Sequence, residues 1–374
     1  MSAQYDHNKN AAFKRGPNPL SVHIGLAMAE YRSLVNKGGA SDDGMLVSML
    51  DGIRKYHDHP YRRPEQSYRE IWRCGEVRLL RRSRVKRGGS PLLVVPSLIN
   101  KSAIFDLMPR RSFLQFLEGR GHDAILLDWG DPVRDPGMAN CGMLMTERLL
   151  PALCAMREYA GVRPDVLGYC MGGLLLLGAC CAAPGITGKI VLLGTPWDFH
   201  AGDGKMLGHV AAGTPVAFHG MNERGYLPKT WLQSLFAAMN AGRAARKFAA
   251  FAALDQDSAK AKLFVAVEDW LNDGADLPAG LARCCIAEWY GENRPASGKW
   301  IVAGNAVDPA VLENHILVVA GGKDRLVPPE SSMALMKQAP HAELLTPDVG
   351  HIGMMAGQGA KEKVWEPVAD WLGS

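Results

Sequence analysis

The stretch "DVLGYCMGG", residues 165–173, decides the fold. The short apolar run Val166-Leu167 precedes a turn that has glycine on both sides of "YCM". The run "LLLLGACCAA" follows at 174–183 and is apolar enough for a buried helix. Strand, tight glycine-flanked turn and helix form the nucleophile-elbow pattern, in which the middle residue of the turn is held exposed. Here that residue is Cys170, where a hydrolase carries serine.

The glycines and the cysteine of this stretch each fit such a turn for a physical reason. The turn is so sharp that side chains at Gly168 and Gly172 would collide with neighbouring backbone. Cys170 then stands at the N-terminus of the following helix, where free N–H groups and the helix dipole stabilise a thiolate. The stretch therefore indicates a cysteine nucleophile.

Composition, charge and cysteine spacing exclude several classes of protein and of site. The chain has 374 residues, 47% of them hydrophobic, and a net charge of +4, which gives no indication of nucleic-acid binding. Apolar runs are too short for a transmembrane span. The polar start lacks the apolar middle of a secretory signal, so we expect a cytoplasmic protein. The eight cysteines show no CxxC spacing. We therefore expect reduced thiols, no metal site and no bound cofactor.

Strands and helices alternate along much of the chain, which predicts a mostly parallel α/β sheet. Two short strands with basic faces are expected within 71–87, and further strands at 92–95, 123–132 and 189–196. A strand followed by a loop is expected at 315–329, and a last strand with its loop at 342–355. The expected helices lie at 110–122, 143–161 and 362–374, and residues 165–182 are expected to form the elbow and its helix. The alternation breaks at 198–310, which is rich in Trp, Phe, Met and Ala at helical spacing. We expect an N-terminal extension at 1–70, a core at 71–197 and 311–374, and an inserted helical cap at 198–310.

Two further residues complete a candidate catalytic triad. A cysteine nucleophile needs a base, and the base needs a carboxylate that fixes its tautomer. Asp324 follows the strand "ILVVAGG", and His351 lies in the loop "DVGHIG" after the last strand. The order nucleophile, acid, histidine is that of α/β-hydrolase folds. The rival carboxylates are Asp348 and Asp308.

Each member of this triad also has a plain structural interpretation. Cys170 would then be a small core residue, because free cysteines are often buried. Asp324 would cap a turn, and His351 would be a satisfied buried histidine. Their agreement in order and in loop position favours the catalytic interpretation.

An oxyanion hole needs backbone N–H groups that point at the acyl oxygen. The N–H of Met171, directly after the nucleophile, is one candidate. The loop "PSLINK" after the first core strand is expected to supply the other, from Leu98.

The motifs together give a family resemblance over roughly residues 70–374. The chain resembles the polyhydroxyalkanoate synthases, which polymerise 3-hydroxyacyl-coenzyme A into bacterial storage polyester. The similar segments are "VPSLINKSAIFDLMPRRSFLQFLEGRGHDAILLDWGDP", "GYCMGG", "TPWDFHAG", "GYLPKTWLQSLFAAMN", "DWLNDGADLP", "GGKDRLVPPESS" and "GHIGMMAGQGAKEKVWEPVADWL". The short N-terminal part looks like the synthases that work with a second subunit. Leu98 stands where the family often has Trp.

The resemblance implies a mechanism and partners. Cys170 would be the acylated nucleophile, His351 the general base and Asp324 its orienting partner. The substrate would be a 3-hydroxyacyl-CoA thioester, with CoA released. The implied partners are a second synthase subunit or a homodimer, and the surface of a polyester granule in the cytoplasm.

Two alternatives stay open at this stage. One is a hydrolase with the same triad, either an acyl-CoA thioesterase or an intracellular polyhydroxyalkanoate depolymerase. The other is a catalytically silent partner that binds a synthase or a granule. The sequence leaves the CoA-binding residues and the acyl chain length open. A basic stretch is a candidate for the CoA phosphates, although a solvated strand face is the better interpretation: Arg78, Arg81, Arg82, Arg84, Lys86 and Arg87.

Overall fold

The computed structural model describes residues 14, 16–36, 43–64, 66–82, 88–239, 243–339 and 341–374. The described residues form two compact units, which we treat separately. The first holds Gln66–Leu227 and Ala275–Ser374, and the second holds the described part of Asp6–Glu65 with Pro228–Gly274. The division into an extension, a core and a cap that we expect from the sequence stays a prediction.

The first unit is built on a sheet of eight strands within the described residues, in the order β1-β2-β6-β3-β7-β8-β13-β14. The strands are β1 (Tyr68–Cys74), β2 (Val77–Arg82), β3 (Ser90–Val95), β6 (His122–Asp128), β7 (Asp165–Tyr169), β8 (Ile190–Leu193), β13 (Ile316–Val319) and β14 (Ala342–Leu345). From β6 to β14 all neighbours pair in parallel, whereas β1 and β2 form an antiparallel edge. The predicted mostly parallel sheet is confirmed. β6, β8 and β13 are buried along their whole length, as a sheet covered on both faces requires.

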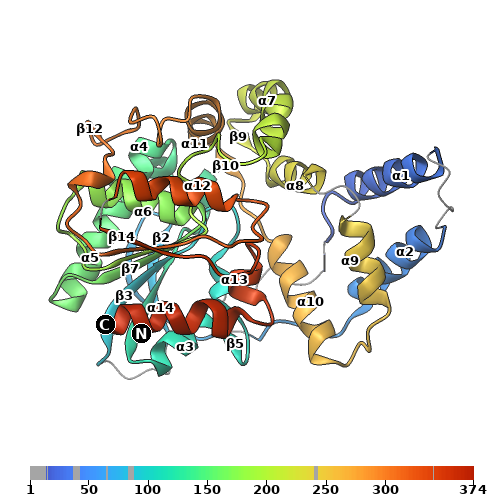
Figure 1. The fold of residues 1–374 in the computed structure, drawn as a ribbon, viewed down its shortest axis with the longest axis horizontal. Coiled ribbons are helices and arrows are strands. Elements are labelled where there is room, and N and C mark those ends of the chain that lie inside the picture. Colours follow the sequence, from blue (N-terminus) through green and yellow to red (C-terminus); the bar gives the residue numbers. More distant parts are fainter. Residues whose placement is uncertain are drawn as a thin grey trace. The chain divides into compact units, whose positions relative to one another are not determined.

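Helices cover both faces of this sheet (Figure 1). Those of the first unit are α3 (Phe113–Gly119), α4 (Cys141–Met143), α5 (Leu150–Ala160), α6 (Met171–Ala182), α7 (Lys205–Arg224), α11 (Ala279–Arg283), α12 (Pro329–Met333), α13 (Gly353–Ala356) and α14 (Glu366–Gly373). α5, α6 and α12 lie on one face, and α3 and α14 on the other (Figure 1). Shorter elements are η1 (Ser102–Phe105), β4 (Asp106–Met108), β5 (Arg111–Ser112), η2 (Pro132–Arg134), η3 (Pro136–Met138), η4 (Leu144–Leu149), β9 (Tyr226–Leu227), β10 (Leu277–Pro278), η5 (Cys284–Gly291), β11 (Ile301–Val302), β12 (Asn305–Ala306), η6 (Pro309–Val311), η7 (Ala334–Lys337) and η8 (Lys361–Trp365).

The helix expected at 143–161 is present as one continuous run from Cys141 to Ala160, with a π-helical stretch inside it. α4 passes into the π-helical turn η4, and α5 begins only at Leu150. Pro151 stands at the start of α5 and has no N–H to donate, so it interrupts the regular α-helical hydrogen bonding at that point.

The cysteines differ from the expectation of reduced thiols. Cys141 and Cys284 form a disulfide across a sequence separation of 143 residues. Their spacing in the sequence gives no sign of this pairing, because the contact depends on how the chain between them folds. Cys170 is among the free cysteines.

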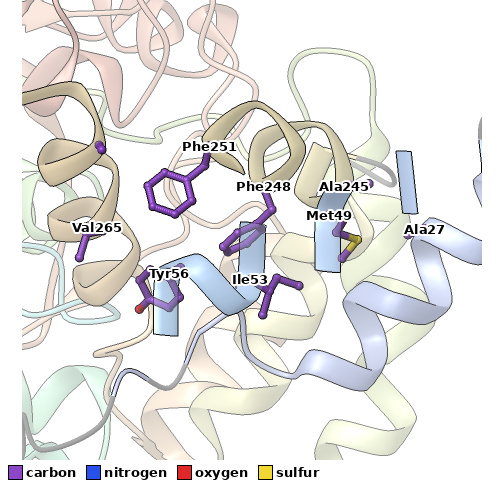
Figure 2. Packing of buried hydrophobic residues seen from close by; sticks show 9 residues of the cluster. Ala27, Met49, Ile53, Tyr56, Ala245, Phe248, Phe251 and Val265 are labelled. Carbon is purple, nitrogen blue, oxygen red and sulfur yellow. The ribbon is translucent and has the colours of Figure 1, made fainter. Parts of the chain in front are cut away.

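The second unit is helical and has a core of its own. Its helices are α1 (Leu20–Asn36), α2 (Asp43–Asp58), α8 (Lys229–Ala238), α9 (Arg243–Ala252) and α10 (Ala259–Leu271). Figure 2 shows the core side chains between α2, α9 and α10, with Met49, Tyr56 and Phe248 fully buried. The backbones of α2 and α9 approach so closely that a Cβ on Gly52 would lie 2.0 Å from the carbonyl oxygen of Phe248. In the described ranges, no helix is long and apolar enough to cross a membrane.

Candidate active site

Cys170 occupies the turn between β7 and α6 that the sequence predicts. Its backbone has φ 55° and ψ −130°, a conformation that costs a non-glycine residue energy and is typical of functional turns. A Cβ on Gly168 would lie 2.4 Å from the Cα of Gly173, and one on Gly172 would lie 2.2 Å from the carbonyl oxygen of Pro96. Both glycines are therefore required for the turn to close. The cysteine side chain is half-buried, as a free thiol.

Asp324 and His351 are brought together by the loops that follow β13 and β14. The Nδ1 of His351 lies 2.6 Å from Oδ2 of Asp324, and both side chains are buried. The other carboxylate oxygen of Asp324 accepts hydrogen bonds from the backbone N–H groups of Leu326 and Val327, each at 2.9 Å. These bonds hold the carboxylate beside the imidazole, so a neutral ring carries its proton on Nδ1 and leaves Nε2 as the acceptor.

The rival carboxylates lie elsewhere. Asp348 is exposed and forms a surface ion pair with Lys323 at 2.7 Å. Asp308 caps η6, where its Oδ1 accepts from the N–H of Ala310 at 2.9 Å. Of the three carboxylates that the sequence brings forward, Asp324 is the one paired with His351.

The thiol of Cys170 is the second polar partner of the His351 ring. Burial alone would lower the pKa of His351, because it disfavours the charged ring. The Asp324 carboxylate, together with the charge of Cys170 and the hydrogen bonds to both residues, outweighs burial and raises the pKa of His351 to about 10. The three predicted residues thus form one electrostatic unit.

Two residues that the sequence analysis did not assign lie next to the imidazole of His351. The ring of Tyr169 stacks on it, and the Tyr169 hydroxyl donates to the His351 carbonyl at 3.2 Å. Gly194 has φ 52°, and a Cβ there would lie 2.7 Å from Cε of Met354 and 3.1 Å from Nδ1 of His351. In the sequence, only its position beside the nucleophile points to a role for Tyr169. Nothing in "LLGTP" points to a role for Gly194.

The two residues expected to form the oxyanion hole come from neighbouring segments. Met171 is the first residue of α6, and the first N–H groups of a helix have no partner within it. The contact of Gly172 with Pro96 places this helix start against the loop that carries Leu98, whose side chain is buried. Their role as N–H donors to an acyl oxygen stays a prediction.

The basic stretch at the antiparallel edge is not a free strand face. Arg78 pairs with Asp128, and Arg81 pairs with Asp123 at 2.8 Å. Arg82 lies 3.0 Å from Glu118. Because these three arginines form ion pairs within the protein, the prediction of a solvated strand face is wrong for them, and so is that of a free phosphate site. Arg84, Lys86 and Arg87 lie outside the described residues.

Comparisons with known proteins agree with this fold. The family model of the alpha/beta hydrolase fold matches residues 91–358. In Haloferax mediterranei, a protein named Poly(3-hydroxyalkanoate) polymerase subunit PhaC is 28% identical over 288 residues, which cover 75% of this chain. The match spans only 58% of that relative's own length. The Allochromatium vinosum protein of the same name is 28% identical over 75% of this chain and 80% of its own.

A solved carboxylesterase structure from Nitrososphaera gargenis is also similar, with a TM-score of 0.49 and 13% identity over 79% of this chain and 94% of its own. The predicted fold class and the resemblance read from the motifs are confirmed by the family model and the curated relatives. The chain belongs to the alpha/beta hydrolase fold family, and polymerase subunits of poly(3-hydroxyalkanoate) are among its relatives.

Proposed function

We propose that this chain is a cysteine acyltransferase that polymerises (R)-3-hydroxyacyl-CoA thioesters into polyhydroxyalkanoate. The observation that carries the proposal is the pairing of His351 with Asp324 beside a cysteine in a nucleophile elbow. The names of the relatives supply the substrate class. CoA enters as part of the substrate, and no bound cofactor is needed.

The first half of the reaction forms an acyl-enzyme. A protonated His351 stabilises the thiolate of Cys170, which attacks the carbonyl carbon of the thioester. The developing oxyanion is bound by the N–H groups of Met171 and Leu98. The carbon–sulfur bond to CoA then breaks, and the CoA sulfur takes the proton from His351. The acyl group is now a thioester of Cys170, so it keeps its activation.

The second half transfers this acyl group to a hydroxyl. Acylation removes the negative charge of Cys170, which is one of the causes of the high pKa of His351. The imidazole, neutral after its proton has gone to CoA, therefore has a lower pKa and stays unprotonated. Its Nε2 accepts the proton of the hydroxyl at the end of another hydroxyacyl unit. The alkoxide attacks the thioester, an ester bond forms, and Cys170 leaves as the thiolate. Water in the site would instead release free hydroxyacid.

The relatives are named as subunits, which supports a second synthase subunit or a second copy of this chain as partner. A polyester granule surface is the proposed place of work, because the product is insoluble in water.

The proposal is tested by CoA release from 3-hydroxybutyryl-CoA, with the acyl product identified by mass. We expect release and oligomers from the wild type, and neither from Cys170→Ala. Free hydroxyacid alone would establish the hydrolase instead. No release with any acyl length, alone or with a polymerase partner subunit, would establish a silent binding protein.

A further inference from the structure

Trp129 lies one residue beyond the end of β6, beside the loop that follows β3. The two strands pair in parallel, so both loops leave the sheet at the same edge. The side chain of Trp129 is buried, and its indole Nε1–H donates to the carbonyl oxygen of Pro96 at 3.0 Å. A buried tryptophan usually has a partner for its N–H, so this bond alone indicates only a satisfied core residue. The position of the acceptor gives Trp129 a further role.

The carbonyl group of Pro96 lies against the nucleophile elbow. A Cβ on Gly172 would stand 2.2 Å from its oxygen and 2.6 Å from its carbon. Gly172 is two residues after Cys170, within the first turn of α6. One carbonyl group therefore meets the indole of Trp129 and the backbone of the elbow at the same time.

The same carbonyl group belongs to the peptide that leads to Leu98. Each peptide unit is a rigid plane, and neighbouring planes turn only about φ and ψ of the residue between them. The plane that carries the Pro96 carbonyl and the plane that carries the Leu98 N–H meet at Ser97. Holding the first plane therefore limits the directions in which the Leu98 N–H can point.

Other contacts fix the loop beyond Leu98. The hydroxyl oxygen of Ser97 accepts from the N–H of Ile99 at 3.3 Å, and the carbonyl oxygen of Ile99 accepts from the N–H of Ala275 at 2.9 Å. The N–H of Leu98 itself donates to no acceptor within the part of the chain that the structure describes. The loop thus has fixed contacts on both sides of a backbone donor that is left available.

The backbone of Trp129 is in turn held from the antiparallel edge of the sheet. The preceding residue, Asp128, forms a buried ion pair with Arg78 of β2. The following residue, Gly130, has φ 65°, and a Cβ there would lie 2.5 Å from the carbonyl oxygen of Glu76. Because both of its neighbours are held, the indole extends from a backbone that has little freedom to move.

We infer that Trp129 is a positioning residue, whose indole N–H holds the Pro96 carbonyl so that the Leu98 N–H points at the developing oxyanion. This inference rests on the proposed function for the acyl transfer itself. It adds that the donor in the loop depends on a side chain that acts through the backbone of Pro96. Loss of the indole N–H should therefore slow the step that forms an oxyanion and leave the reactivity of the thiol unchanged.

The test uses two reactions of Cys170 that differ in one respect. In the first, the thiolate attacks the carbonyl carbon of p-nitrophenyl butyrate and a tetrahedral oxyanion forms. The carbon–oxygen bond then breaks, p-nitrophenolate leaves, and the butyryl group becomes a thioester of Cys170. In the second, the thiolate displaces iodide from iodoacetamide, and no oxyanion forms. Single-turnover release of nitrophenolate measures the first rate, and mass spectrometry of the peptide that contains Cys170 measures the second.

Four altered forms are compared with the wild type. Trp129→Phe removes the indole N–H and part of the ring system. Benzothienylalanine placed at position 129 has the shape of tryptophan with sulfur instead of the N–H, and it keeps the test valid where Trp129→Phe fails to fold. Trp371→Phe is the matched control, because that indole donates to Glu343 at 2.8 Å in an exposed hydrogen bond. Cys170→Ala shows which signals come from the nucleophile.

We expect both changes at Trp129 to slow acylation by about tenfold, which is less than the roughly 10²- to 10³-fold that loss of an oxyanion donor itself costs. Alkylation of Cys170 should stay at the wild-type rate. With 3-hydroxybutyryl-CoA, kcat should fall by a similar factor while KM changes little, because the substrate bears no oxyanion before it reacts. Trp371→Phe should match the wild type in every measurement.

The inference is wrong if the benzothienylalanine form is acylated at the wild-type rate, because any loss in Trp129→Phe would then come from packing. It is also wrong if acylation and alkylation slow together, since the indole would then only hold the elbow in shape.

The failure of this inference is distinct from that of the proposed function. Slower butyrylation in a chain that never releases CoA would uphold the positioning role of Trp129 and refute the acyltransferase of CoA thioesters. CoA release that is unaffected by the changes at Trp129 would do the reverse. A wild type that neither the ester nor the thioester acylates would refute both.

Discussion

The ring of Tyr169 lies on the imidazole of His351, with centroids 4.9 Å apart and 28° between the planes. The same side chain reaches past the ring to donate to the His351 carbonyl at 3.2 Å. Behind it, the ring of Phe105 meets Tyr169 edge-on at 5.9 Å. Tyr169, the residue before the nucleophile, thus contacts the proposed base His351 twice, through its ring and through its hydroxyl.

This relationship predicts different results for two substitutions of Tyr169. Tyr169→Phe keeps the stacked ring and loses one hydrogen bond, so we expect CoA release within a few-fold of wild type. Tyr169→Leu loses the aromatic contact, whose contribution of about 0.5–1.5 kcal/mol corresponds to roughly a two- to thirteenfold loss in kcat/KM. The pH profile of kcat/KM separates positioning from folding. An unshifted profile in Tyr169→Leu would contradict a role through His351.

Asp324 and Asp348 form a matched pair for testing the triad. Asp324→Asn should reduce CoA release by about 10²-fold or more, because the amide no longer holds the His351 tautomer that the reaction needs. Asp348→Asn should leave release near the wild-type level, because that carboxylate only pairs with Lys323 at the surface. The assignment would fail if the two variants had equal activity.

The fold could be predicted from the sequence because its signals are local. The apolar runs of the parallel strands and the glycine pair around "YCM" each act within a few residues of the chain. Cys170, Asp324 and His351 each follow a different predicted parallel strand, and the carboxyl ends of parallel strands meet at one edge of the sheet. A reader of the sequence alone can therefore place all three residues at the same edge of the sheet.

The features that escaped prediction depend on contacts between distant segments. Cys141 and Cys284 approach only after α4 and η5 have folded against each other. The arginines of β2 look like a solvated face until their partners Asp123 and Asp128 arrive from β6. Gly194 has a positive φ and little room for a side chain, because His351 and Met354 from far along the chain lie against it.

The pKa of His351 gives a prediction about Cys170. Since the charge and hydrogen bond of Cys170 contribute to raising the pKa to about 10, Cys170→Ala should lower the pKa of the ring. NMR titration of the His351 ring protons measures this directly. Cys154→Ser should leave the titration unchanged. A titration that is identical in Cys170→Ala would show that the thiol and the ring do not interact.

The raised pKa of His351 also determines how the free energy of unfolding changes with pH. The folded pKa lies above the ordinary value near 6.5, so the protonated ring stabilises the folded state. This stabilisation is fully present below about pH 6.5 and is lost as pH rises through about 10. The free energy of unfolding should fall across this window in wild type and fall less in His351→Gln. Parallel curves for the two proteins would rule out the linkage.

In the second unit, replacing glycine by alanine should have opposite effects on the free energy of unfolding at Gly52 and at Gly25. Gly52 on α2 has the Phe248 carbonyl oxygen 2.0 Å from where a Cβ would lie, whereas Gly25 on α1 has nothing within 4 Å. Gly52→Ala must push α2 and α9 apart, and we expect it to cost about 1–3 kcal/mol of stability, as overpacking does. Gly25→Ala should instead stabilise the unit by up to about 1 kcal/mol, because alanine favours the helix.

Urea unfolding of both variants and the wild type measures the two effects. The sign should differ between the glycines although the added methyl group is the same, because only Gly52 lies at a crossing of two backbones. Equal stabilisation by both alanines would mean that α2 and α9 do not approach each other at Gly52. Equal loss would mean that α1 is packed at Gly25, contrary to the open space found there.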